Sequence, residues 1–168
     1  MMLAAPWRKL LLALHVLTSV AFPGAVAGFL ALAVVGATNN DPSVVRAVYV
    51  GMAVVTWDVI VPLAAASLVI GVAASLGTPW GLLRYYWLIV KLVLTLVAVA
   101  VLMLQTGTID MLSEAALRGD LSAMNGPRMG MILHGAGGFV VLAVATVLSI
   151  YKPRGMTAYG VRKIATSG

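Results

Sequence analysis

The chain has 168 residues, of which 62% are hydrophobic and only 10% are charged, and its mean hydropathy is +1.06. Soluble domains carry about 25% charged residues, so this composition excludes an ordinary soluble fold and indicates a membrane protein. The net charge of +6 does not indicate nucleic-acid binding, because the basic residues flank apolar segments and do not cluster with aromatic residues on one polar face. The chain has no cysteine, which excludes disulfides and thiolate metal sites.

Four apolar segments are each long enough to cross a hydrocarbon layer of ~30 Å, which takes about 20 helical residues. They cover approximately residues 10–37, 46–76, 85–105 and 128–151. Short connections make neighbouring segments antiparallel, which predicts an all-α integral membrane four-helix bundle, up-down-up-down, in a single transmembrane domain. Residues 106–127 are expected to form a polar loop containing a short amphipathic helix on the membrane surface, and residues 152–168 a basic tail.

The basic residues at the ends of the apolar segments and outside them are divided unequally between the two sides of this bundle. The side that carries both termini has Arg8, Lys9, Arg84, Lys152, Arg154, Arg162 and Lys163, and the other side has Arg46, Arg118 and Arg128. Lys and Arg accumulate in cytoplasmic loops, so this bias predicts cytoplasmic termini. The sequence thus predicts a multi-pass protein of the bacterial inner (plasma) membrane whose first partner is the lipid bilayer.

Each predicted span contains one His, Asp or Lys away from its ends, and these are His15, Asp58, Lys91 and His134. His15 and Lys91 lie six or seven residues past basic residues that mark the membrane surface, so both are expected ~10 Å deep on the terminal side. Asp58 and His134 are expected together, nearer the other side. His15 and Asp58 are 43 residues apart, as are Lys91 and His134, which is consistent with two tandem helical hairpins.

The four residues have structural as well as functional interpretations. Lys91 can extend its amine towards the membrane surface, and His15 can be a neutral packing residue. Asp58 has no long apolar stem, so pairing with His134 is the simplest way to satisfy it. Met131 lies three residues before His134 on the same helical face, and a thioether with an imidazole suits Cu(I). A copper site formed by His134, Met131 and Asp58 is therefore one alternative.

Several residues resemble a known group of membrane proteins. His15 is followed by Phe22 and Gly24, and this spacing resembles the first helix of CopD-like copper-resistance domains and HemJ-type protoporphyrinogen oxidases. The turn at residues 78–81 (Thr-Pro-Trp-Gly), leading into the helix that carries Lys91, resembles the start of the third helix in the same group. Phe22 stands where the group usually has Trp, and the fourth helix has no acidic residue near Arg128. The resemblance covers helices one to three and is closest to uncharacterised bacterial members.

The resemblance implies that His15 and Lys91 are cofactor-binding residues for haem b or a related tetrapyrrole. The main hypothesis is a small four-span membrane protein with a redox or haem-metabolism role, with His15 as the strong ligand and Lys91 at a propionate or as a weak second ligand. The alternatives are a copper-handling or permease-like protein and a non-catalytic accessory subunit of a larger membrane complex. The sequence leaves open whether the protein is an enzyme, and it is compatible with a redox partner or a homo-oligomer.

Overall fold

The structure is a computed structural model that describes residues 4–77, 82–120 and 125–165. The described helices are α1 (Ala5–Thr38), α2 (Pro42–Val55), the π-helical turn η1 (Thr56–Ile60), α3 (Val61–Leu76), α4 (Tyr86–Arg118), α5 (Asn125–Tyr151) and α6 (Ala158–Ala165). Four helical stretches are long and apolar enough to cross a membrane: α1, α2 continued through η1 and α3, α4, and α5. The predicted all-α bundle of four membrane-spanning helices is thereby confirmed.

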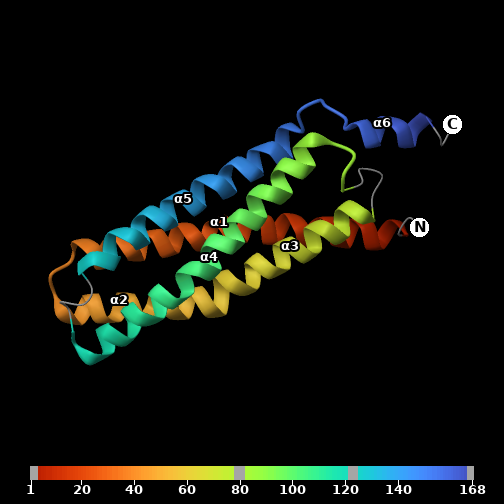
Figure 1. Cartoon of the computed structure of the whole chain (residues 1–168). Helices are drawn as coiled ribbons and strands as arrows, with labels where there is room; N and C mark the ends of the chain where they lie inside the picture. Colours follow the sequence, from red (N-terminus) through yellow and green to blue (C-terminus); the bar gives the residue numbers. More distant parts are fainter. Residues whose placement is uncertain (1–3, 78–81, 121–124, 166–168) are drawn as a thin grey trace.

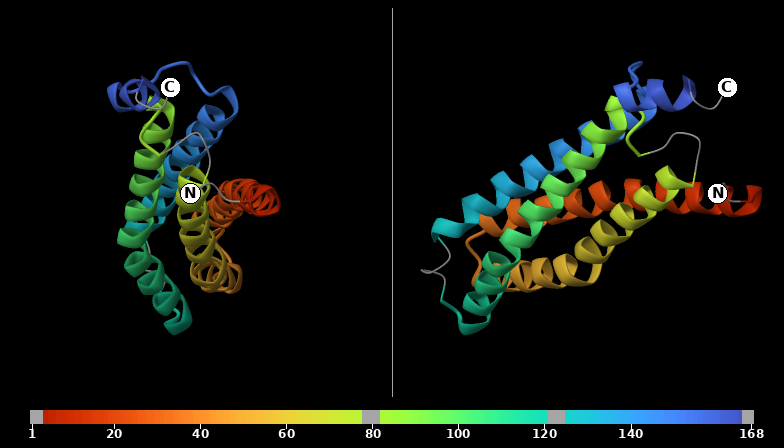
Figure 2. Two further views of the ribbon diagram at one scale, coloured as in Figure 1. Left: turned by 90° about the vertical axis from the view of Figure 1, so that its right-hand side faces the viewer. Right: turned by 45° about the vertical axis from the view of Figure 1, so that its right-hand side comes forward.

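The four long stretches run back and forth, so that both chain ends lie at one end of the bundle (Figure 1). We call this end the terminal end and the opposite one the distal end. α1 packs against α5 on one side and against α2 and α3 on the other, while α4 packs against α2 and α5. Two further views show α3 and α4 diverging towards the terminal end (Figure 2).

A short turn at the distal end joins α1 to α2. The Asp41 side chain caps α2 by accepting hydrogen bonds from the Ser43 amide at 2.8 Å and the Ser43 hydroxyl at 2.7 Å. These bonds, above all the one from the Ser43 side chain, lower the pKa of Asp41 below its ordinary value. Pro42 follows directly in the first turn of the helix, where its missing N–H costs nothing.

A single π-helical turn, Thr56–Ile60, separates α2 from α3. Pro62 lies just beyond it; proline has no N–H and its ring crowds the carbonyl four residues earlier, so the wider turn absorbs both defects. The turn places the Trp57 and Asp58 side chains on the exposed surface. The Trp57 indole Nε1 donates a hydrogen bond of 2.9 Å to Asp110 of α4, which ties the two helices together here.

The third spanning helix is longer than predicted. We expected a polar loop from residue 106 with a separate surface helix, but α4 continues without a break to Arg118 and ends at Gly119, whose φ is +75°. The apolar face of this extension is buried in the protein and does not lie on lipid. It contributes Ile109, Leu112, Ala115 and Ala116 to a core shared with Val45, Val48, Tyr49 and Met52 of α2. The segment is amphipathic, as predicted, but its apolar face packs against α2.

The C-terminal segment folds back onto the start of α4. Thr157 donates from its amide to the Arg84 carbonyl at 2.9 Å and from its hydroxyl to the Leu83 carbonyl at 2.6 Å. Gly160 lies so close that an added Cβ would be 2.6 Å from the Arg84 carbonyl oxygen. These contacts fix the position at which α4 begins, and with it the height of the first turns of α4.

Candidate functional site

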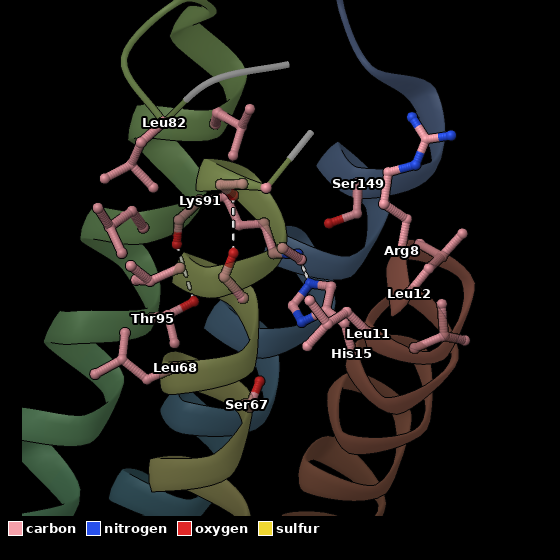
Figure 3. A pocket seen from close by; sticks show the side chains of 18 of the residues that line it. Arg8, Leu11, Leu12, His15, Ser67, Leu68, Leu82, Lys91, Thr95 and Ser149 are labelled. Atoms are coloured by element: carbon pink, nitrogen blue, oxygen red, sulfur yellow. Dashed lines mark hydrogen bonds between the residues drawn. The ribbon is translucent and has the colours of Figure 1, made fainter. Parts of the chain in front are cut away.

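A cavity of about 580 Å³ lies at the terminal end, between α1, α3 and α4. This volume falls within the range of about 300–1,000 Å³ that small-molecule sites occupy. The apolar part of its wall is formed by Leu11, Leu12, Val16, Leu68, Val72, Leu82, Leu88 and Leu92, with small residues Ser67, Gly71, Ala74 and Ser75 on α3. Figure 3 shows side chains from α1, α3, α4 and α5 directed into this space. The site is therefore built from all four spanning stretches.

His15 and Lys91 meet at this cavity. The Lys91 Nζ atom is 3.1 Å from the His15 Nε2 atom, and the hydrogen bond crosses from α4 to α1 (Figure 3). The prediction that these two residues share one level on the terminal side is thus confirmed. An ammonium group only donates, so Nε2 accepts and the imidazole proton is on Nδ1. The Ser19 hydroxyl lies 3.5 Å from the same Nε2 atom and can act as a second partner.

Gly71 of α3 forms a notch that holds the imidazole. An added Cβ at Gly71 would be 2.9 Å from His15 Cε1 and 3.4 Å from Nδ1, which is too close for an undisturbed ring. Nδ1 is buried there and has no hydrogen-bond partner within the described part of the chain. A buried donor without a partner costs about 1–3 kcal/mol, so this placement of the ring lowers the stability of the ligand-free protein.

The charges around the cavity have one sign. Arg8 and Lys9 lie in the first turns of α1, Lys152 follows the last residue of α5, and Lys91 lies deeper. Among the described residues that line the cavity there is no aspartate or glutamate. Like charges gathered around an apolar space raise its electrostatic potential and favour an anionic ligand. The cavity therefore suits a molecule with an apolar body and acidic groups.

The residues of the predicted copper site, His134, Met131 and Asp58, do not all meet at one cavity. Met131 is buried, with 2% of its surface exposed, and it lines a cavity of about 60 Å³ together with His134. The His134 Nδ1 atom donates to the Gly130 carbonyl of its own helix at 2.6 Å. Asp58 is exposed on η1 and does not line this cavity, and no hydrogen bond joins it to His134. The expected Asp58–His134 pair is therefore wrong.

The depth of Asp58 explains why it needs no partner. About 20 residues cross the hydrocarbon layer in an upright helix, and counting back from Gly77 reaches Trp57. The same count from Lys9, along α1, reaches Phe29, which lies beside this level in the lining of the smaller cavity. This count places Asp58 near the distal boundary of the layer, next to a tryptophan of the kind that is enriched at the interface.

The structure therefore predicts that Asp58→Asn and Asp58→Ala have the same small effect. Each should change the free energy of unfolding in detergent by less than about 0.5 kcal/mol, as surface substitutions usually do. Asp110→Ala provides the contrast, because it removes the acceptor of the Trp57 indole and should cost about 1 kcal/mol. Thermal unfolding followed by circular dichroism measures all three. A much larger loss for Asp58→Ala than for Asp58→Asn would restore a pairing role for the carboxylate.

Three residues that shape the site or its surroundings, Gly71, Thr157 and Gly160, could not be singled out from the sequence. Gly71 is one small residue among many in an apolar helix, and its role depends on the imidazole that α1 places against it. Thr157 and Gly160 lie in the segment expected to be only a basic tail. The turn at residues 78–81, which contributed to the family resemblance, lies outside the described residues. Within the described parts, no group of three or more His, Asp or Glu side chains is arranged to hold a metal ion.

The chain matches no protein-family model, and comparisons with curated proteins and with solved structures also give no match. The resemblance to CopD-like and HemJ-type proteins thus stays a prediction that depends on His15, Lys91 and their surroundings. The function has to be argued from the cavity itself.

Proposed function

We propose that the protein binds haem b or a related tetrapyrrole in the cavity at the terminal end and has a redox or haem-metabolism role. The observation that carries the proposal is the combination of an apolar space of about 580 Å³, one imidazole at its wall and basic residues with no acidic residue among its described lining. A tetrapyrrole has a flat apolar body and carboxylate side groups, so both parts of the ligand find matching surfaces.

The residues present fit such a group. His15 is the residue that would hold the iron, since a histidine is the usual proximal ligand of haem b. The binding nitrogen would be Nε2, so Lys91, which contacts this atom at 3.1 Å, would have to turn away from it. Arg8, Lys9 and Lys152 at the cavity mouth would hold the carboxylates by charge-assisted hydrogen bonds. Gly71 leaves the imidazole a recess in α3, so the ring can lie at the wall without filling the cavity. Bound haem would supply one-electron redox chemistry.

Two roles were expected for Lys91, contact with a propionate of the ligand and weak ligation of the iron, and its position favours the first. Lys91 and His15 are 3.1 Å apart in direct contact. The Lys91 ammonium group would therefore hold a carboxylate of the ligand beside His15, by a charge-assisted hydrogen bond.

The orientation follows from the same basic residues. The excess of Lys and Arg on the side of the termini supports cytoplasmic termini in a bacterial inner membrane. The cavity then opens from the cytoplasmic leaflet, which a hydrophobic ligand made inside the cell can reach.

A haem titration of the ligand-free protein in detergent tests the proposal. We expect saturable binding with a sharp absorption band, and His15→Ala should weaken the affinity at least about tenfold, or about 1.4 kcal/mol. His134→Ala is the matched control, because it removes the other histidine, which lies outside this cavity. Equal affinity of His15→Ala and wild-type protein would contradict the assignment, and so would a loss only in His134→Ala.

A further inference from the structure

We propose that the same cavity binds an anionic phospholipid from the leaflet on the terminal side. This is a second ligand class, and the inference does not require that a tetrapyrrole binds. It depends on two properties of the described cavity: the positions of its charges and its apolar walls.

The charges lie where a lipid phosphate lies. Arg8 and Lys9 are in the first turn of α1, and Lys152 follows α5, so all three are at the membrane surface on the terminal side. Phosphodiester groups occupy this level in a bilayer, and basic pockets between spanning helices are known binding sites for acidic lipid headgroups. Arg8 and Lys9 are half-buried to exposed, so a headgroup can reach them without rearrangement of the helices.

Below the charged residues, the parts of the cavity wall that α3 and α4 form are apolar. Leu68 and Val72 line it from α3, and Leu88 and Leu92 line it from α4. These side chains continue inwards from the charged mouth, along the direction in which acyl chains leave a headgroup. The two helices diverge towards this end (Figure 2).

The deeper polar pair suits the ester region of the lipid. Lys91 lies five residues into α4, below the mouth, and its amine reaches the cavity wall together with the His15 imidazole. Ester carbonyl oxygens lie just below the phosphate and accept hydrogen bonds, which an ammonium group can donate. The polar groups of the cavity are thus ordered by depth in the same way as those of a phospholipid.

The sign of the charge decides the lipid class. A phosphatidylglycerol headgroup has a net negative charge and neutralises the basic mouth, whereas phosphatidylcholine brings its own quaternary cation next to Arg8 and Lys9. Because the described lining contains no acidic residue to receive that cation, the choline lipid gains only the contacts of its phosphate and has an unpaired cation next to basic residues. We therefore expect selection of the anionic headgroup and not merely retention of any lipid.

Native mass spectrometry of the detergent-solubilised full chain tests this. Protein from cells unable to make haem is mixed with equal amounts of phosphatidylglycerol and phosphatidylcholine that have identical acyl chains. We expect the phosphatidylglycerol adduct to exceed the other at least about fivefold, a ratio that corresponds to about 1 kcal/mol, the typical contribution of one basic residue near an anionic lipid surface. Equal adducts would overturn the proposal.

The variant Arg8→Gln/Lys9→Gln should lose this preference, because both side chains keep their size and hydrogen-bonding ability but not their charge. Arg46→Gln/Arg118→Gln is the matched control, since it removes the same charge at the distal end, and it should keep the preference. Circular dichroism verifies that both variants are folded. An equal loss in both variants would show a general charge effect and no site at the cavity.

Two further comparisons distinguish lipid binding from the binding of a free anion and from haem binding. Displacement of the lipid by inorganic phosphate alone would identify a site for a free anion and overturn the lipid assignment. The experiment contains no haem, so a failed haem titration leaves the lipid result unaffected. Conversely, a protein that binds haem but shows no lipid preference would retain the proposed function and lose this inference.

Discussion

Gly71→Ala is expected to weaken haem binding at least about tenfold, which corresponds to about 1.4 kcal/mol, while the helical bundle remains folded. The added methyl group would be 2.9 Å from His15 Cε1, so the imidazole has to leave its recess in α3. Its Nε2 atom then loses its position beside Lys91. The contact is to the end of a movable side chain and not to backbone, so the helices themselves need not shift.

The fold should tolerate this substitution well. Alanine favours a helix over glycine by about 1 kcal/mol, which offsets the cost of moving the ring. Gly24→Ala is the matched control, because an added Cβ there meets no atom within 4 Å and the residue also lies inside a spanning helix. Haem titration and thermal unfolding of both variants separate binding from stability. Unchanged affinity in Gly71→Ala would show that the His15 position does not matter for the ligand.

Lys91→Met is expected to stabilise the ligand-free protein and to weaken its binding of a carboxylate-bearing ligand. The Lys91 amine lies in the membrane at a cavity that also holds Arg8, Lys9 and Lys152, without an acidic residue among the described lining. A lysine costs ~2.5–3.5 kcal/mol at the centre of a spanning helix and less near its end. Methionine has similar length and no charge, so we expect a gain of about 1 kcal/mol.

The loss of the Lys91–His15 hydrogen bond reduces this gain only in part. The Ser19 hydroxyl is 3.5 Å from the His15 Nε2 atom and can donate to it in place of the amine. Lys9→Met, a change of the same charge at the membrane surface, should leave ligand-free stability almost unchanged. Thermal unfolding of haem-free protein provides the comparison. A clear loss of stability in Lys91→Met would mean that the residue is structural, which would contradict its assignment to the ligand.

The four spanning helices and the shared depth of His15 and Lys91 could be predicted from the sequence, because both depend on distance along a helix. Hydropathy identifies the spanning stretches, and counting residues from the flanking basic side chains places His15 and Lys91 at one depth. Counting cannot say which helices are neighbours. The extension of α4 to Arg118 was missed for this reason, since its apolar face has the same pattern whether it meets lipid or α2.

The remaining errors and omissions concern contacts between segments far apart in the chain. The expected depths of Asp58 and His134 agree, and a hydrogen-bonded pair was predicted for this reason. In the structure Asp58 lies on an exposed turn. Gly71 and Gly160 have specific roles only because another segment, carrying His15 or Arg84, lies against them. No property of the glycines themselves distinguishes them from Gly24, which has no such neighbour. Tertiary packing decides all of these cases.

The most direct test of the proposed function is the absorption spectrum of the protein as purified in detergent from cells that make haem, recorded oxidised and then reduced with dithionite. We predict an intense Soret band and sharp reduced α and β bands, all lost in His15→Ala and retained in His134→Ala. Comparable yields of folded protein, judged by circular dichroism, make the three samples equivalent. A featureless visible spectrum from folded wild-type protein purified from haem-replete cells would contradict haem binding at the cavity between α1, α3 and α4.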